Sequence, residues 1–465
     1  MSREKELVKK TGIYAVGNLG AKVLSYVMVL VYSYFILPDE MGYYDLIITT
    51  VAMIQPLVIF QMNDGIYRFL AERKDKNSLA TVGTGVKFLV LTTLFTEFVF
   101  FIISFFYHFE YAEWIALYIC SVIFYAFFQD AIRGFGSSKL YAFTGVLNSA
   151  VMLVYEIIGL MFLKQGVKAL LISKVVANYI CIILLFIVQK ELRESIKEKF
   201  DKKIFKELLR YSAPLVPNTI CWWIVNASDR YIILYFLGTS YNGIYSMATK
   251  FPTVLTTLTS IFYLAWQEAA IKEYDTPDRD SFFSNIFKKY YVLLFTLGIC
   301  AIPATKLVIE LLVSSDYKSA WMYTGFLYLG AIFSALCSFL GLGYQISKQT
   351  ERSLFTTVFA AILNVVINIV LIRVIGLQAA SFSTFAAYLF LFIIRLKHTE
   401  RYYKLSADWK EFITLFAISL ALILFVWSVN NIAIIVVATL TCIVLLIYKN
   451  KYLVSTVIRK VLHKY

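Results

Sequence analysis

The stretch Tyr34–Tyr44 reads YFILPDEMGYY, and a later stretch, Tyr235–Tyr245, reads YFLGTSYNGIY. Tyr, Phe, Gly and Tyr recur at the same spacing, all shifted by 201 residues. A second pair of similar stretches, GVKALLIS from Gly166 and GLQAASFS from Gly376, is shifted by 210 residues. Matches that recur about half a chain apart indicate an internal repeat, with about nine residues inserted in the second copy.

The composition places the chain in a membrane. Hydrophobic residues make up 60% of it and charged residues 16%, whereas a soluble domain is about half apolar and about a quarter charged. The net charge of +14 could indicate nucleic-acid binding in a soluble protein. Here the basic residues concentrate in short loops between apolar segments, so we expect anionic lipid head groups, and no nucleic acid, beside them.

The apolar segments predict the topology. A spanning helix needs roughly 20 apolar residues, and about fourteen segments meet that length, including a seventh at 212–237 and an eighth at 242–265. Alternate loops hold about 34 basic residues and the intervening loops about 4, which predicts that both termini are cytoplasmic.

The repeat and the topology together predict an all-α architecture. Six helices per copy is an even number, so the two copies share one orientation and should surround a central cavity, as in transporters with parallel repeats. We expect an N-terminal lobe at 1–189, a second lobe at 211–396, and two extra helices with a basic tail at 397–465. The segment 190–210 alternates Lys and Glu at helical spacing, which indicates either an amphipathic cytoplasmic helix or a solvated linker.

The sequence has no pattern typical of disulfide, metal, nucleotide or catalytic sites. The six cysteines lie in apolar stretches without a CxxC pair, and none of the three histidines is paired at metal spacing. We therefore expect no metal, no disulfide framework and no cofactor. A Walker A loop is missing, so direct use of ATP is not expected. The outer loops have about ten residues or fewer, too little to present a set of catalytic groups, so we expect no enzyme.

Ionisable residues inside spans are the main functional candidates, because each costs about 2.5 kcal/mol or more at the bilayer centre unless it faces a cavity or a partner. Lys22 follows small residues that permit close approach. Asn226 and Arg230 are one helical turn apart and share a face. Lys250 precedes Pro252, which should bend the eighth helix. The predicted cavity residues are Lys22, Arg68, Lys174, Asn226, Arg230 and Lys250.

The sequence leaves two roles possible for each of two carboxylates. Glu156 and Asp229 could couple transport to an ion or form structural pairs, Glu156 with Lys174 and Asp229 with a neighbouring helix. Two further pairs of residues, each spaced i,i+4, favour a structural role over a functional one. Lys306 should pair with Glu310, and Asn364 and Asn368 should hydrogen-bond between helices.

The surplus of cations in the spans favours an anionic cargo, and Arg and Lys are natural partners of phosphate. A low-dielectric wall around such a cavity strengthens this attraction. An exporter of cationic drugs would be expected to carry carboxylates instead.

Over its whole length the chain resembles the Wzx-type oligosaccharide flippases of the multidrug/oligosaccharidyl-lipid/polysaccharide exporter (MOP) superfamily. The resemblance rests on LPDEMGYY, KELLRYSAPLVPN, ASDRYIILYFLGTSYNGIYSMATKFP and NVVINIVLIRVIGLQAASFSTFAAY. It implies a two-lobed fold of fourteen helices around a cationic cavity, to which Lys22, Asp229, Arg230 and Lys250 would contribute.

The resemblance also implies a cargo and a location. Such flippases move undecaprenyl-pyrophosphate-linked repeat units of O-antigen or capsule across the bacterial cytoplasmic membrane, with a polysaccharide polymerase and glycosyltransferases as partners. Independently of the resemblance, an H⁺ or Na⁺ gradient could drive the step. Two alternatives stay open, a cation-coupled multidrug exporter of the same fold and a lipid II flippase, although the latter carries more arginines in its first two helices than Lys22 and Arg68 supply here.

Overall fold

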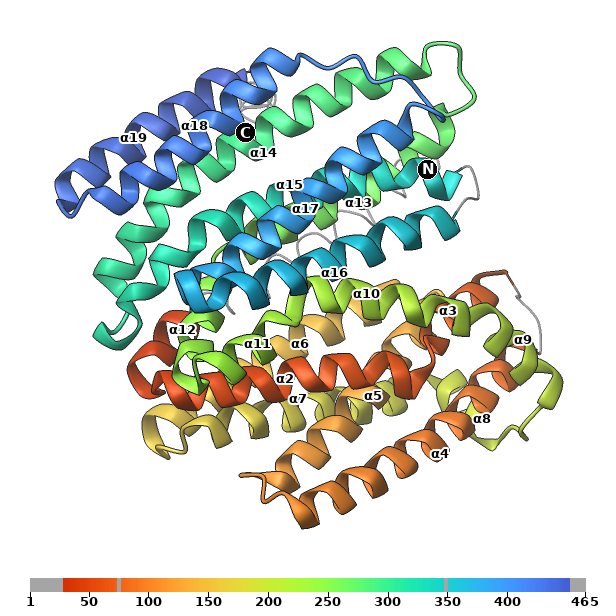
Figure 1. The fold of residues 1–465 in the computed structure, drawn as a ribbon. Helices are drawn as coiled ribbons and strands as arrows, with labels where there is room; N and C mark the ends of the chain where they lie inside the picture. The colour runs from red at the N-terminus through yellow and green to blue at the C-terminus, as the bar shows by residue number, and fades with distance from the viewer. Residues whose placement is uncertain (1–27, 73–76, 347–349, 452–465) are drawn as a thin grey trace, which may run out of the picture. The chain divides into compact units, whose positions relative to one another are not determined.

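A computed structural model describes residues 28–72, 77–346 and 350–451, and every regular element in these ranges is helical (Figure 1). Eleven helices among the described residues are long and apolar enough to cross a membrane. The predicted all-α membrane fold is therefore confirmed. The count of about fourteen spans stays a prediction.

The chain divides into two compact units, Met1–Trp223 and Ile224–Tyr465. The predicted division into two lobes, a linker and a C-terminal appendage stays a prediction. The first unit contains a helix over residues 28–35 and then α2 (Pro38–Ile59), α3 (Met62–Glu72), α4 (Asn77–Phe106), α5 (Ala112–Gly134), α6 (Ser138–Ile157) with the π-helical turn η1 (Ile158–Phe162), α7 (Val167–Val188), α8 (Lys190–Lys197), α9 (Lys202–Ser212) and η2 (Ala213–Leu215).

Helix α10 (Val216–Ala227) crosses the boundary between the units. The second unit continues with α11 (Asp229–Phe236), α12 (Thr239–Lys250), α13 (Thr253–Glu273), α14 (Arg279–Leu312), η3 (Ser315–Ala320), α15 (Trp321–Ile346), α16 (Thr350–Ile375), α17 (Gln378–Thr399), α18 (Trp409–Ser428) and α19 (Ile432–Lys449).

The helix starts reproduce the repeat seen in the sequence. Helix α2 begins at Pro38 and α12 at Thr239, the same shift of 201 residues that relates the two opening stretches. Gly166 and Gly376 precede α7 and α17 with φ angles of 54° and 59°. This left-handed region favours glycine, which explains why the sequence repeats a glycine here.

Two predicted spans are not single helices. The span at 212–237 is divided into η2, α10 and α11, with a break at Ser228. The span at 242–265 is interrupted between Lys250 and Thr253. Pro252 has no N–H group to continue the hydrogen-bond ladder, so the helix is interrupted at the position of the expected bend. Broken helices at membrane depth occur where backbone is buried in protein or lines a cavity.

The segment 190–210 forms two short helices, α8 and α9, joined by an elbow, and not the single helix that was one of its two expected forms. Its role as a cytoplasmic linker stays a prediction. Leu192 and Leu208 are buried while the lysines between them are exposed, which is the amphipathic pattern expected from the sequence. Gly83 of α4 permits the contact, because a Cβ atom there would lie 2.2 Å from the carbonyl oxygen of Ser195.

Replacing Gly83 by alanine is expected to separate α8 from α4. The new methyl group would meet backbone and the Cβ of Glu198 at 2.9 Å, and neither can give way like the end of a flexible side chain. Limited trypsin digestion of the reconstituted protein should then cut the linker several times faster than in wild type. Gly145→Ala is the matched control, because nothing lies within 4 Å of its Cβ. Equal cleavage of Gly83→Ala and wild type would contradict this packing.

The two extra helices α18 and α19 are fastened to α14 at both ends. At one end the Lys288 ammonium of α14 lies 3.4 Å from Asp408 and 3.5 Å from Glu411. Lys449 of α19 lies 2.6 Å from Glu411 of α18, which joins the two extra helices to each other. The pKa of Asp408 is lowered by the backbone N–H of Glu411 and then by Lys288. The helix pair is therefore an integral part of the second unit.

Near the other end of α14, Lys306 binds the end of α18. Its ammonium donates to the carbonyl oxygens of Val426 at 2.9 Å and Val429 at 2.6 Å. The same nitrogen lies 3.7 Å from the centre of the Trp321 ring. The predicted pairing with Glu310 is therefore wrong, because the unpaired carbonyls at the end of α18 offer a closer partner.

Candidate functional site

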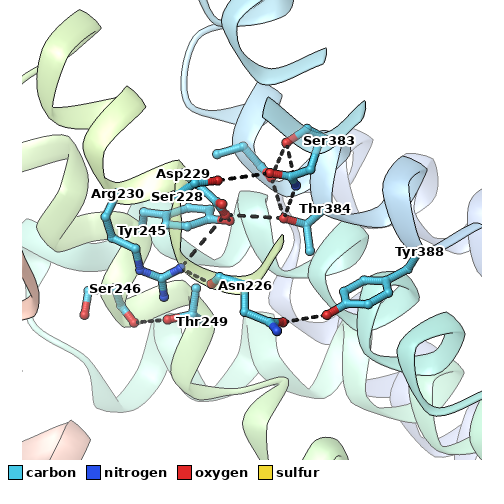
Figure 2. A network of polar contacts seen from close by, with 12 residues as sticks. Asn226, Ser228, Asp229, Arg230, Tyr245, Ser246, Thr249, Ser383, Thr384 and Tyr388 are labelled. Carbon is cyan, nitrogen blue, oxygen red and sulfur yellow. Dashed lines mark hydrogen bonds and ion pairs between the residues drawn. The ribbon is translucent and has the colours of Figure 1, made fainter. Parts of the chain in front are cut away.

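A buried polar network of the second unit surrounds Asp229, the first residue of α11 (Figure 2). Asp229 is 1% exposed. Its Oδ2 atom accepts hydrogen bonds from the hydroxyl of Tyr245 at 2.5 Å and from Thr384 Oγ1 at 3.3 Å. Helices α12 and α17 thus both contribute a hydroxyl group to one carboxylate.

Arg230 lies next to this carboxylate. Its Nη1 atom is 3.9 Å from Asp229 Oδ2 and donates to the carbonyl oxygen of Asn226 at 2.7 Å. The guanidinium carbon lies 5.4 Å from the centre of the Tyr245 ring, and the side chain is 12% exposed. Because the helix is interrupted at Ser228, the carbonyl oxygen of Asn226 is available to Arg230. The guanidinium is therefore held in place while it stays partly exposed.

A chain of amides and hydroxyls extends the network to α16. Ser228 Oγ donates to Asn364 Oδ1 at 3.3 Å, and Asn364 Nδ2 donates to Thr384 Oγ1 at 3.3 Å and Ser383 Oγ at 3.5 Å. Separately, the hydroxyl of Tyr388 donates to Asn226 Oδ1 at 2.7 Å. The expected interhelical hydrogen bonding of Asn364 is confirmed.

Two buried groups retain unused hydrogen-bonding capacity. In the described ranges, Asp229 Oδ1 has no hydrogen-bond donor, and both amide atoms of Asn368 have no partner. Asn368 is fully buried and lies one helical turn from Asn364. An unsatisfied buried polar atom costs about 1–3 kcal/mol. A proton or a small cation on the carboxylate would relieve part of that cost.

The structure assigns different surroundings to the other predicted cavity residues. Lys22 lies outside the described residues. Lys250 is the half-buried last residue of α12, at the helix break. Arg68 belongs to the first unit, where it is exposed and its guanidinium lies 4.5 Å from the centre of the Tyr211 ring. Its role at the mouth of a cavity stays a prediction.

Glu156 is the buried carboxylate of the first unit. It is 3% exposed and accepts hydrogen bonds from the hydroxyls of Tyr32 at 2.6 Å and Ser173 at 3.1 Å. These hydroxyls occupy the carboxylate, and its pairing with Lys174 stays a prediction. The Lys174 ammonium lies 5.9 Å from the centre of the Tyr118 ring.

Several members of these clusters were not predicted. Tyr245, Thr384 and Tyr388 carry hydroxyl groups on helices, which are too common to be distinctive in sequence. Tyr245 does lie in the repeated opening stretch, and Thr384 directly follows the second repeated stretch, so the repeat could have identified both. Glu97, a half-buried carboxylate of the apolar helix α4, was missed as well.

The described residues contain no group of three His, Cys, Asp or Glu side chains close enough to hold a metal ion. Around Asp229, any cation would instead be held by one carboxylate with neutral hydroxyl, amide and backbone oxygens. Such oxygen ligands suit hard cations and protons.

Comparison with known proteins reveals both family and fold. A family model described as polysaccharide biosynthesis protein matches residues 7–271. A lipid II flippase, MurJ, in an inward closed conformation superposes with a TM-score of 0.72 at 13% identity, covering 96% of this chain and 99% of that chain. The comparison with curated proteins finds no match.

Two MATE transporters have the same fold. An inward-facing MATE family transporter of the MOP superfamily gives a TM-score of 0.68 at 13% identity, over 83% of this chain and 98% of that chain. A mutant of the Vibrio cholerae MATE transporter VcmN gives 0.63 at 10% identity, over 85% of this chain and 96% of that chain.

The apolar helices and these superpositions define a multi-pass membrane protein with the fold of the MOP superfamily transporters. Because the family model matches more than half of its length, the chain belongs to the polysaccharide biosynthesis protein family.

Proposed function

We propose that the protein flips undecaprenyl-pyrophosphate-linked oligosaccharide repeat units from the cytoplasmic to the outer leaflet of a bacterial cytoplasmic membrane. Membership of the polysaccharide biosynthesis protein family is the observation that carries this proposal. The cargo joins a polar glycan and a pyrophosphate to a lipid tail, so its head group cannot cross hydrocarbon unaided. Two lobes that alternate between inward and outward openings would give it a polar path.

The anchored guanidinium of Arg230 supplies the chemistry that a pyrophosphate needs. Its contacts with Asn226 and Asp229 hold the planar group in one orientation, and a planar fork of N–H donors binds phosphate oxygens in pairs. Lys22, Lys174 and Lys250 would add positive charge along the path, with Arg68 at its mouth. The polyprenyl tail would remain in the surrounding lipid.

Asp229 would couple this step to H⁺ or Na⁺. The carboxylate oxygen without a hydrogen-bond donor is buried, and it belongs to the group that lies 3.9 Å from the proposed cargo ligand Arg230. A change of charge on one of these groups alters the affinity of the other, and such linkage is reciprocal. Glu156, which already accepts two hydrogen bonds, fits a structural role better.

The test is the pool of lipid-linked glycan in a strain that lacks the gene. We expect the pyrophosphate-linked repeat unit to accumulate on the inner leaflet and surface polysaccharide to fall. Wild-type protein should reverse both effects, while Lys250→Ala should fail to do so. Lys410→Ala, which removes an exposed lysine from the first turn of α18, is the control and should restore both.

Other outcomes would identify a different cargo. Accumulation of lipid II, with arrest of cell-wall synthesis, would replace the proposal with a lipid II flippase. An unchanged lipid-linked pool together with increased sensitivity to cationic drugs would replace it with a multidrug exporter.

A further inference from the structure

The elbow between α8 and α9 is held firmly against one end of α4 (Figure 1). The Lys87 ammonium donates to the carbonyl oxygens of Ile196, at 3.3 Å, and Glu198. The backbone N–H of Asp201 donates to Thr84 Oγ1 at 3.1 Å. The elbow therefore has a defined position on the first unit.

A series of contacts between aromatic rings connects α4 to the elbow. The ring of Phe88 on α4 lies 5.2 Å from Phe205, which lies 5.4 Å from Phe200. Phe200 ends this series and is 42% exposed, as is Ile196. The outer side of the elbow thus presents two large apolar side chains.

Positive charge surrounds these two side chains. All the basic residues of the elbow are exposed: Lys197, Lys199, Lys202, Lys203 and Lys206. Of the two acidic residues among them, Asp201 directs a carboxylate oxygen to the N–H groups of Lys203 and Ile204, and Glu198 is half-buried. A hollow of about 640 Å³ is lined by residues 197–202 and Ala80.

The elbow follows closely on a candidate membrane span. Helix α7, a membrane span, ends at Val188, and its last residues Ile187 and Val188 are 67% and 55% exposed. The linker begins two residues later and the elbow nine residues later, so its lysines and projecting apolar groups lie close in sequence to the exposed apolar end of this span. Basic amphipathic segments with this arrangement bind anionic membrane surfaces.

We propose that the elbow Lys197–Lys206 is a binding site for the head groups of anionic phospholipids in the leaflet beside it. The phosphodiester would contact Lys199 and Lys202 at the hollow, while Phe200 and Ile196 enter the acyl region. An acidic protein surface fits less well, because it would leave Phe200 and Ile196 without an apolar environment. This inference does not depend on the cargo of the proposed flippase.

The test compares lipid binding by the full-length protein and two variants. Protein released from mixed bilayers of phosphatidylcholine and phosphatidylglycerol is examined by native mass spectrometry for retained lipid. Wild type should retain phosphatidylglycerol preferentially, and Lys199→Gln/Lys202→Gln should bind it about 30-fold more weakly, since each lysine near such a surface contributes about fivefold. Lys139→Gln/Lys164→Gln, which also removes two exposed lysines from the first unit, should behave as wild type.

Further arms separate the ligand sources. Glycerol phosphate added in solution should not displace the lipid, whereas Phe200→Ser should weaken its retention. Melting temperatures in phosphatidylcholine alone should agree for all variants, which shows that each is folded. Equal retention of both lipids by wild type, equal loss in the two double variants, or displacement by glycerol phosphate would overturn the proposal.

Discussion

Asp229→Asn is expected to reach the membrane in normal amounts and to lower export of the lipid-linked glycan by about 5- to 150-fold, the range that a coupling free energy of about 1–3 kcal/mol spans. Asparagine has the shape of aspartate and keeps an oxygen acceptor for the hydroxyl of Tyr245. Its neutral amide cannot take up a proton or attract a cation. The measurement is surface polysaccharide and the lipid-linked pool in the complemented deletion strain.

A second readout separates coupling from structure. If Asp229 binds Na⁺ or a proton, the melting temperature of the purified wild type rises with the concentration of that ion. The melting temperature of Asp229→Asn should not change with it. Asp316→Asn, which neutralises an exposed carboxylate of η3, is the control and should match wild type in both assays. Normal export and an unchanged cation response in Asp229→Asn would leave this carboxylate with a structural role alone.

Lys306→Met is expected to release the helix pair α18–α19 from its contact with α14. Methionine fills the space of the lysine stem but leaves the carbonyl oxygens of Val426 and Val429 without their donor. Hydrogen bonds to a charged group contribute about 1.5–3 kcal/mol, and the ammonium over Trp321 adds up to about 2 kcal/mol. We expect a loss of about 3 kcal/mol in stability after the cost of burying the lysine is subtracted.

Cysteine labelling can report this release directly. Cys442 of α19 is 8% exposed, so a membrane-permeant maleimide should label it slowly in wild type and several times faster in Lys306→Met. Peptide mass spectrometry distinguishes Cys442 from the other cysteines. Lys318→Met removes an exposed lysine from η3 and should leave the labelling rate unchanged. A wild-type rate in Lys306→Met would show that the helix pair does not depend on this ammonium.

Sequence patterns predicted the helices better than they predicted the contacts between helices. Apolar length and the positions of basic loops were sufficient for the membrane fold, because both are properties of single segments. The repeat added the equivalence of α2 with α12 and of α7 with α17. Proline chemistry predicted the bend at Pro252, whereas nothing distinctive in the sequence marks the break at Ser228.

The contacts between helices could not be predicted from one sequence. Glu156 was left open between ion coupling and a pair with Lys174, and its two hydroxyl partners, Tyr32 and Ser173, were not predicted. A helical pattern tells which residues share a face, but not which residue of another helix meets them. For the same reason Asp229 and Arg230 were identified as candidates, while their partners Tyr245 and Thr384 were not.

The two left-handed glycines set the rotational phase of α7 and α17. Ser173 and Ser383 each follow their glycine, Gly166 or Gly376, by the same number of residues. Because each residue turns an α-helix by about 100°, inserting or deleting one residue after either glycine would rotate these hydroxyls away from the polar groups that they contact. Natural variation in loop length should therefore be tolerated before each glycine and excluded immediately after it.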